Sequence, residues 1–149
     1  MAGTTTYYPP VAFSFEVSIT GIDGVNEGSF QEVTGLSVKL DVEEVKEGGE
    51  NRFAHRFPSR PKYENLVLRR GMVTSSSLIN WARQAVEQFQ FTTRTVVVSL
   101  LDEEGKNLAS WNFVNAWPVS LKVSDLKAQE NAIAVETLEL SFDYFQRIK

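Results

Sequence analysis

Apolar and polar residues alternate one by one in several separate stretches of this 149-residue chain. In residues 13–19, for example, every odd position is apolar and every even position is polar. A period of two residues places successive side chains on opposite faces of a β-strand, so a chain with many such stretches folds mainly into sheets. Strands are expected over residues 13–19, 30–34, 38–47, 64–70, 95–101, 108–117, 119–123 and 133–145.

A single stretch has the spacing of a helix instead. Serines occupy positions 75–77 and can cap its first turn, and Arg83 and Glu87, four residues apart, can pair on its exposed side. Its apolar face is formed by Leu78, Ala82, Ala85, Val86 and Phe89. About seven strands and one helix predict a mainly β fold, a β-sandwich or partly closed barrel with the helix packed on one face.

The length is close to that of one domain, so residues 13–149 are expected to form a single domain with one core. Residues 1–12 are expected to form an extended arm, because Pro9 and Pro10 favour extended backbone. The chain does not begin with a basic cluster and an apolar run, and it lacks a membrane-length apolar stretch. We therefore expect it to be made in the cytoplasm and not to span a membrane.

The composition excludes several kinds of catalytic centre. The chain has no cysteine, so it cannot form a disulfide, a thiolate zinc site or a cysteine nucleophile. His55 is the only histidine, it lies in an arginine-rich segment, and no serine has the surroundings of a hydrolase nucleophile. The acidic groups in 41–44 and 102–104 are better explained as solvated faces of a strand and a turn than as acid–base pairs or cation ligands. An enzyme is not expected, and no cofactor or metal site is predicted.

Residues 38–62 are expected to contain a strand and then a projecting loop. In the strand, Val38, Leu40 and Val42 alternate with Lys39, Asp41 and Glu43. Glu44 and Val45 break this phase, which predicts a bulge or bend at Glu43–Glu44. Residues 52–62 hold too many prolines and polar groups for regular structure, so they are expected to form the loop.

Opposite charges occupy adjacent blocks of this region. Residues 41–50 contain five acidic residues and one lysine, and residues 52–70 contain six basic residues and one glutamate. Two interpretations remain open. The blocks either pair within one chain, as a hairpin of mixed charge, or they form a head-to-tail interface between copies, in which charge complementarity fixes the register.

Residues 111–118 have an aromatic side chain at every second position except Asn115, and they are expected to pack in the core. An asparagine on such a face needs hydrogen-bond partners.

Five segments, in this order, resemble the tail tube proteins of contractile phages and phage-tail-like injection systems. They are EGGEN (47–51), PSRPKY (58–63), LVLRRG (66–71), WNFVNAWP (111–118) and VETLEL (135–140). Within this family, the five segments are most similar to those of inner-tube subunits of extracellular particles such as the Photorhabdus virulence cassettes and the antifeeding prophage.

This resemblance implies a structural protein. Such subunits form hexameric rings in which strands of neighbours join into a barrel around a lumen, so the sheet edges are completed by ring neighbours. The rings stack into a tube inside a sheath, whose contraction drives the tube through a target envelope. The implied partners are other copies of the chain, sheath subunits, baseplate or hub proteins, tube-terminating proteins and a payload in the lumen. Assembly is expected in the bacterial cytoplasm, followed by release in an extracellular particle or a virion tail.

Two hypotheses concern the sites. The polar face of residues 38–47, with Lys39, Asp41 and Glu43, is expected to line the lumen, because a water-filled channel needs a polar wall. The ring-to-ring contact is expected to use the two charge blocks, through Arg52, His55, Arg56, Arg60, Lys62, Glu47 and Glu50. The alternatives are an adaptor ring between baseplate hub and tube, with the same fold, and a monomeric β-sandwich that binds a carbohydrate or peptide through exposed aromatic residues.

Overall fold

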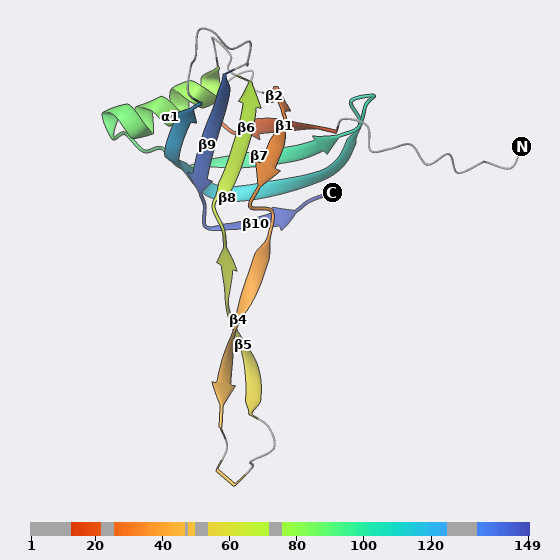
Figure 1. The fold of residues 1–149 in the computed structure, drawn as a ribbon, viewed down its shortest axis with the longest axis vertical. Helices are drawn as coiled ribbons and strands as arrows, with labels where there is room; N and C mark the ends of the chain where they lie inside the picture. The colour runs from red at the N-terminus through yellow and green to blue at the C-terminus, as the bar shows by residue number, and fades with distance from the viewer. Residues whose placement is uncertain (1–12, 22–25, 47, 50–53, 72–75, 125–133) are drawn as a thin grey trace, which may run out of the picture.

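The computed structural model describes residues 13–21, 26–46, 48–49, 54–71, 76–124 and 134–149, in which it places ten strands and one helix (Figure 1). Along the chain the elements are β1 (Ser14–Ile19), β2 (Asn26–Phe30), β3 (Glu32–Thr34), β4 (Val38–Val45), β5 (His55–Tyr63), β6 (Leu66–Gly71), α1 (Ser77–Gln88), β7 (Arg94–Leu101), β8 (Asn107–Val123), β9 (Val135–Ser141) and β10 (Tyr144–Arg147). An eight-stranded sheet has the order β2-β1-β7-β8-β9-β6-β3, with β10 also pairing with β8, and β4 and β5 form a separate sheet. The prediction of a mainly β fold with one helix is confirmed.

The two halves of the main sheet share one core. Val17 in β1, Val98 in β7 and Leu68 in β6 are fully buried in the same hydrophobic cluster, together with Phe113 in β8 and Leu138 in β9. Strands β1 and β7 run across the direction of β6 and β9 in Figure 1, as in a sandwich. Within the described residues β2 pairs only with β1 and β3 only with β6, so the sheet does not close into a barrel.

Helix α1 begins as its sequence predicts and ends differently. Ser76 is the N-cap, and its hydroxyl accepts a hydrogen bond of 3.1 Å from the backbone N–H of Ile79. The expected ion pair between Arg83 and Glu87 is present at 3.2 Å. Val86 and Phe89 were expected on the buried face, but both are exposed. The helix instead buries a narrower face formed by Leu78, Trp81, Ala82 and Ala85.

Strand β8 is a single long strand where two were expected. A bulge lies between Phe113 and Ala116, where the pairing with β7 shifts by one residue. Asn115 sits in this bulge with a left-handed φ of 54°, which asparagine tolerates better than most residues. The extra residue inverts the facing of the residues after it, so Phe113 and Ala116 are buried while Trp117 is exposed. The expectation that Trp117 packs in the core is wrong for this reason.

Residues 55–63 form strand β5, although a loop was expected from Pro58 and Pro61. The two strands β4 and β5 make a hairpin that projects from the body at the end of the long axis opposite α1 (Figure 1). Pro58 pairs with Val42 and Pro61 with Leu40, so β5 contains one extra residue between them. Because of this bulge, both prolines lie opposite residues on the same face of β4, whereas residues three apart in a regular strand lie on opposite faces. No shift occurs at Glu43–Glu44, so the bulge predicted there is misplaced.

Two other expected strands are divided. The segment expected near 30–34 consists of β2 and β3, and the segment expected over 133–145 consists of β9 and β10. Between β9 and β10, Phe142 turns inward and packs against Phe113 at 4.8 Å between ring centroids. The arm expected over residues 1–12 lies outside the described residues.

Candidate functional site

No arrangement typical of a catalytic centre surrounds the candidate residues within the described ranges. His55 lies on the hairpin, where its ring stacks on Phe57 with 6.3 Å between centroids. Asp102 accepts hydrogen bonds from the backbone N–H groups of Glu104 and Lys106 and so closes a turn. Among the residues that the structure describes, no group of three His, Asp or Glu side chains is placed to hold a metal ion. None of the described helices is long and apolar enough to cross a membrane.

The hairpin pairs the two charge blocks with each other. Arg56 forms an ion pair with Glu44 at 3.3 Å, and Lys62 forms one with Asp41 at 3.1 Å. Both basic side chains remain mostly exposed, so each pair contributes little to stability in one chain. The interpretation of a hairpin with mixed charge therefore describes these residues. Arg60 is exposed on the same strand, and three further residues of the hypothesis, Glu47, Glu50 and Arg52, lie outside the described residues.

Arg70 does not belong to the surface charge that its sequence block suggested. Its side chain is buried, donates a hydrogen bond of 2.7 Å to the Ser76 hydroxyl and lies 4.6 Å from the centroid of the Phe30 ring. Its cross-strand partner is Glu136, which is also buried. The basic block is therefore divided between an exposed hairpin and a buried structural group.

The two faces of β4 carry the residues that the alternation predicts. Val38, Leu40 and Val42 share one face, and these residues are 51%, 54% and 58% exposed. Lys39, Asp41 and Glu43, the residues proposed to line a lumen, share the other face. At the base of the hairpin Tyr63 packs on Phe142 and Phe145 of the body, at 5.6 and 5.2 Å between ring centroids.

The apolar side of the hairpin changes face toward its tip. Because no bulge interrupts β4 at Glu43–Glu44, Glu44 and Arg56 continue the face of Val42. Val45 therefore lies on the opposite face, which also carries Phe57, and both are exposed. The hairpin thus presents an apolar surface on one face at its base and on the other face at its tip. Nothing in the described part of the chain covers either surface.

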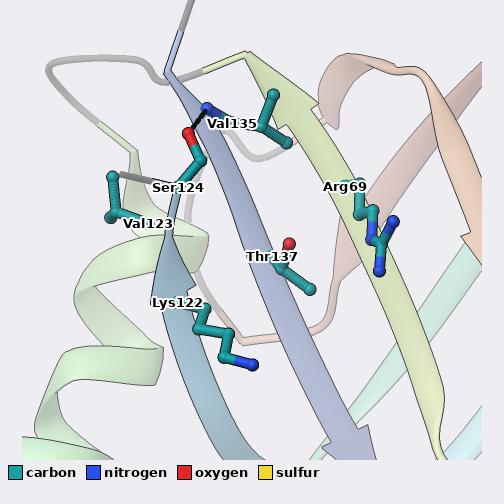
Figure 2. A pocket seen from close by; sticks show the side chains of 6 residues that line it. All are labelled: Arg69, Lys122, Val123, Ser124, Val135 and Thr137. Carbon is teal, nitrogen blue, oxygen red and sulfur yellow. Dashed lines mark hydrogen bonds between the residues drawn. The ribbon is translucent and has the colours of Figure 1, made fainter. Parts of the chain in front are cut away.

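The half of the main sheet formed by β8, β9, β6 and β3 has a polar outer face. Arg69, Thr137 and Lys122 are directly opposite one another on β6, β9 and β8. Figure 2 shows their side chains on the same side of the sheet. They line a hollow of about 300 Å³. Glu32 on β3 extends this row and forms an ion pair with Arg69 at 3.4 Å. Lys122 makes no ion pair with any described residue.

Two edges of this half-sheet are unpaired within the described chain. One is the outer edge of β3. The other is the edge of β8 over residues 117–123, which pair with β9 on one side, whereas β7 pairs only with the earlier part of β8. An unpaired edge offers a row of backbone N–H and C=O groups to another strand.

Exposed aromatic side chains lie beside the β8 edge. Phe89 follows α1 with a left-handed φ of 54° and is 83% exposed. Its ring packs edge-on against Phe91, which packs edge-on against Trp117, with centroids 4.9 and 5.6 Å apart. Val86 and Val119 are exposed next to them in the same hollow. We call Val86, Phe89, Phe91, Trp117 and Val119 the aromatic patch. Sequence reasoning missed it, because helical and strand periodicity placed three of these residues in the core.

Comparison with known proteins gives a consistent result. The family model of the T4-like virus tail tube protein gp19 matches residues 11–146. A chain in the structure of the anti-feeding prophage baseplate is 28% identical with a TM-score of 0.78, over 95% of this chain and 97% of that chain. A chain in the sheath-tube complex of the extracellular contractile injection system PVC is 28% identical with a TM-score of 0.75, over 96% and 93%. A chain of the anti-feeding prophage tube-terminating cap structure is 27% identical with a TM-score of 0.75, over 99% and 98%. Among curated proteins no match was found.

Proposed function

Because the chain belongs to the T4-like virus tail tube protein gp19 family, we propose that it is an inner-tube subunit of a contractile injection system. In this proposal six copies form a ring, the rings stack into a hollow conduit for a payload, and contraction of a surrounding sheath drives the tube through a target envelope. The role is structural, and no residue acts as a catalyst. The sheath-tube complex matched over nearly the whole length of both chains supports this assignment.

The observation that carries the proposal is the β4–β5 hairpin. It projects from the body and presents exposed Val38, Leu40 and Val42, which no other described element covers. Exposed apolar surface of this kind marks a contact with another molecule. A contact between two different surfaces of identical chains is heterologous, and it generates either closed rings or open stacks. A tube of stacked rings contains heterologous contacts of both kinds: those that close each ring and those that stack one ring on the next.

The charged residues of the hairpin are the proposed ring-to-ring contact. The described part of the hairpin extends along the long axis, away from α1 (Figure 1), and in this proposal it points toward the next ring. Arg56, Arg60, Lys62 and His55 would contact acidic groups there, with Arg52, Glu47 and Glu50 as further members of the same contact. The ion pairs of Arg56 and Lys62 within the hairpin are exposed, so exchange of partners costs little. Lys39, Asp41 and Glu43, on the face of β4 opposite Val38, Leu40 and Val42, remain the proposed polar lining.

An adaptor ring between the baseplate hub and the tube is a second candidate. It is favoured by the similarity to a chain in the anti-feeding prophage baseplate structure. Tube and adaptor differ in length, because an adaptor stops after one or two rings. The third candidate, a monomeric ligand-binding module, would use exposed aromatic residues, and the aromatic patch is a surface of the described residues that fits it.

We further propose that the subunit assembles in the bacterial cytoplasm with baseplate, sheath and terminating proteins and leaves the cell in an extracellular particle. The similar chains come from structures of a sheath-tube complex, a baseplate and a tube-terminating cap, which supports these partners.

Negative-stain electron microscopy of the full-length chain, combined with native mass spectrometry, tests the proposal. We expect six-fold rings or hollow tubes with a six-subunit species as the smallest assembly. Long tubes in the presence of sheath subunits distinguish the tube from the adaptor. A chain that stays monomeric, even after baseplate components are added, would contradict both ring candidates and favour the ligand-binding module.

A further inference from the structure

We propose that the hollow on the outer face of β6, β9 and β8 binds the phosphate group of a small phosphate monoester. Arg69, Thr137, Lys122 and Ser124 hold the phosphate oxygens, and the organic group of the ester lies against Val123 and Val135. The hollow belongs to a single copy of the chain. This inference therefore goes beyond the proposed tube function and does not depend on ring formation.

Three of the lining residues lie side by side across three strands. Arg69 on β6 is opposite Thr137 on β9, and Thr137 is opposite Lys122 on β8. Neighbouring strands are about 5 Å apart, so the two cationic residues are about 10 Å apart at the backbone. Figure 2 shows the short threonine side chain between the two longer ones. A short side chain between two long ones leaves a space that both cationic groups can reach.

The polar groups around this space are hydrogen-bond donors. Among the described residues, the lining contains a guanidinium, an ammonium and two hydroxyl groups, and it contains no carboxylate. The Ser124 hydroxyl accepts a hydrogen bond of 2.8 Å from the backbone N–H of Val135, so its own hydrogen can be donated to a ligand. Cationic donors form their strongest hydrogen bonds with ionised oxygens. The lining therefore favours an anion.

The cations have few acidic partners within the chain. Arg69 pairs with Glu32 at 3.4 Å through one nitrogen, and a guanidinium has five N–H donors in all. Lys122 makes no ion pair with any described residue. Both side chains can therefore turn donors toward an anion that lies above Thr137.

The arrangement of the donors favours phosphate over a carboxylate. Donors approach the hollow from β6 on one side, from β8 on the other and from Thr137 between them. The three terminal oxygens of a phosphate monoester point in different directions, so they can accept from all three strands. The two oxygens of a carboxylate lie in one plane and match a single guanidinium better.

The rest of the lining is apolar and favours an ester over inorganic phosphate. Val123 and Val135 line the same hollow, whose volume is about 300 Å³. Sites for small molecules have volumes of about 300–1,000 Å³, so this hollow suits a phosphate with a small organic group. Contact of that group with the two valines removes apolar surface from water and strengthens binding.

Isothermal titration calorimetry of the full-length chain tests the site with phenyl phosphate, inorganic phosphate and benzoate. We expect one phenyl phosphate to bind per chain, at least about tenfold more tightly than either of the other probes. Inorganic phosphate lacks the apolar group, and benzoate lacks the third oxygen. Equally tight binding of benzoate would contradict a phosphate site, and equally tight binding of inorganic phosphate would contradict an ester site.

A competition experiment separates a small ester from the end of a nucleic acid, because both carry the same phosphate group. We expect a nucleoside monophosphate to displace phenyl phosphate and a 5′-phosphorylated oligonucleotide to displace it at least about tenfold less well, since the hollow is at the small end of the range for ligand sites. Equal displacement by the oligonucleotide would overturn the assignment to a small ligand.

Two substitutions remove donors with little change in side-chain volume. Lys122→Met should weaken the binding of phenyl phosphate at least about tenfold, because it removes a charged donor. Thr137→Val should weaken it about threefold, because it removes a neutral donor. Lys106→Met is the matched control, since it makes the same change in net charge at an exposed lysine in the turn before β8. It should bind like the wild type. Thermal unfolding of each variant confirms that it folds.

The outcomes separate this site from the tube function. Loss of binding in Lys122→Met and Thr137→Val, with normal binding in Lys106→Met, supports the site. Unchanged binding in Lys122→Met, or the same loss in Lys106→Met, would show that the hollow does not hold the phosphate. If the wild type forms rings and binds no phenyl phosphate, the site is wrong and the tube function stands. If it binds phenyl phosphate and never forms rings, the tube function fails and the site stands.

Discussion

The side chain of Asn115 donates a hydrogen bond of 2.7 Å to the carboxylate of Asp143 and so ties the bulge of β8 to the turn between β9 and β10. The backbone N–H of Asp143 also donates to the carbonyl of Val114, at 3.0 Å. At this point β8 passes from its pairing with β7 to its pairing with β9. These two hydrogen bonds therefore lie at the junction between the two halves of the main sheet.

Replacing Asn115 should separate the backbone contribution from the hydrogen bond. We expect Asn115→Ala to lower the free energy of unfolding by about 1–2 kcal/mol, because alanine resists the left-handed backbone and cannot bond Asp143. Asn115→Gly keeps the backbone accessible and should cost less, about 0.5–1 kcal/mol. Urea denaturation measures both. Equal losses would show that the backbone conformation contributes nothing.

Arg70 and Arg69 are neighbours in sequence and differ in their surroundings. Arg70→Met removes a buried guanidinium beside Glu136 and Ser76, so we expect a loss of about 3 kcal/mol in the free energy of unfolding. Arg69→Met removes one partner of an exposed ion pair and should change the free energy of unfolding by less than about 1 kcal/mol. Thermal unfolding of the two variants in one buffer makes the comparison. Similar losses would contradict the structural role assigned to Arg70.

Leu40 and Lys39 lie on opposite faces of the same strand and allow a matched test of the hairpin. Leu40→Ser removes an exposed apolar side chain, so the monomer should unfold within about 0.5 kcal/mol of the wild type while ring or tube formation falls sharply. Lys39→Ser should leave assembly intact if that face lines the lumen. Sedimentation of assembled material measures both. Normal assembly of Leu40→Ser would show that the apolar face of the hairpin is not part of the interface.

Phe89 should have opposite effects on the free chain and on the assembly. Glycine suits the left-handed position at the end of α1, so Phe89→Gly should stabilise the monomer by about 0.5–1 kcal/mol. The same change removes the most exposed member of the aromatic patch, so assembly should weaken. Denaturation and sedimentation are measured on the same preparation. A variant that is more stable and also assembles better would show that the patch is not an interface.

The charges of the hairpin can be tested by salt. Arg56→Glu with Arg60→Glu should shorten the tubes and reduce the dependence of their assembly on ionic strength, because both arginines are proposed to contact acidic groups of the next ring. Tube length is measured by electron microscopy at two salt concentrations. Unchanged length and unchanged salt dependence would contradict this role.

Local patterns predicted the elements whose signals are complete within a few residues. The alternation of 13–19 predicted β1, and the serine cap and the spacing of Leu78, Ala82 and Ala85 predicted α1. The same patterns failed where pairing between distant segments decided the outcome. Residues 55–63 form a strand because a bulge opposite β4 accommodates both prolines, and no signal within 52–62 reveals that partner.

The candidate site shows the same division. The opposite charge blocks predicted that Asp41, Glu44, Arg56 and Lys62 would meet other charges, and in the structure they meet one another. The polar row of Glu32, Arg69, Thr137 and Lys122 could not be predicted, because its members come from four strands that are far apart in the sequence. The aromatic patch was missed because the bulge at Asn115 inverts the facing of Trp117.

The sequence by itself determined the strand-rich class, the single capped helix and, through the resemblance of five ordered segments, the family. These follow from short-range periodicity and from motifs that need no partner to be recognised. Only the tertiary structure decided which strands pair, where each bulge falls and therefore which side chains face outward. The reason is physical: in a sheet the facing of each side chain depends on registers set by residues distant in the chain, and one inserted residue reverses every later position in the strand.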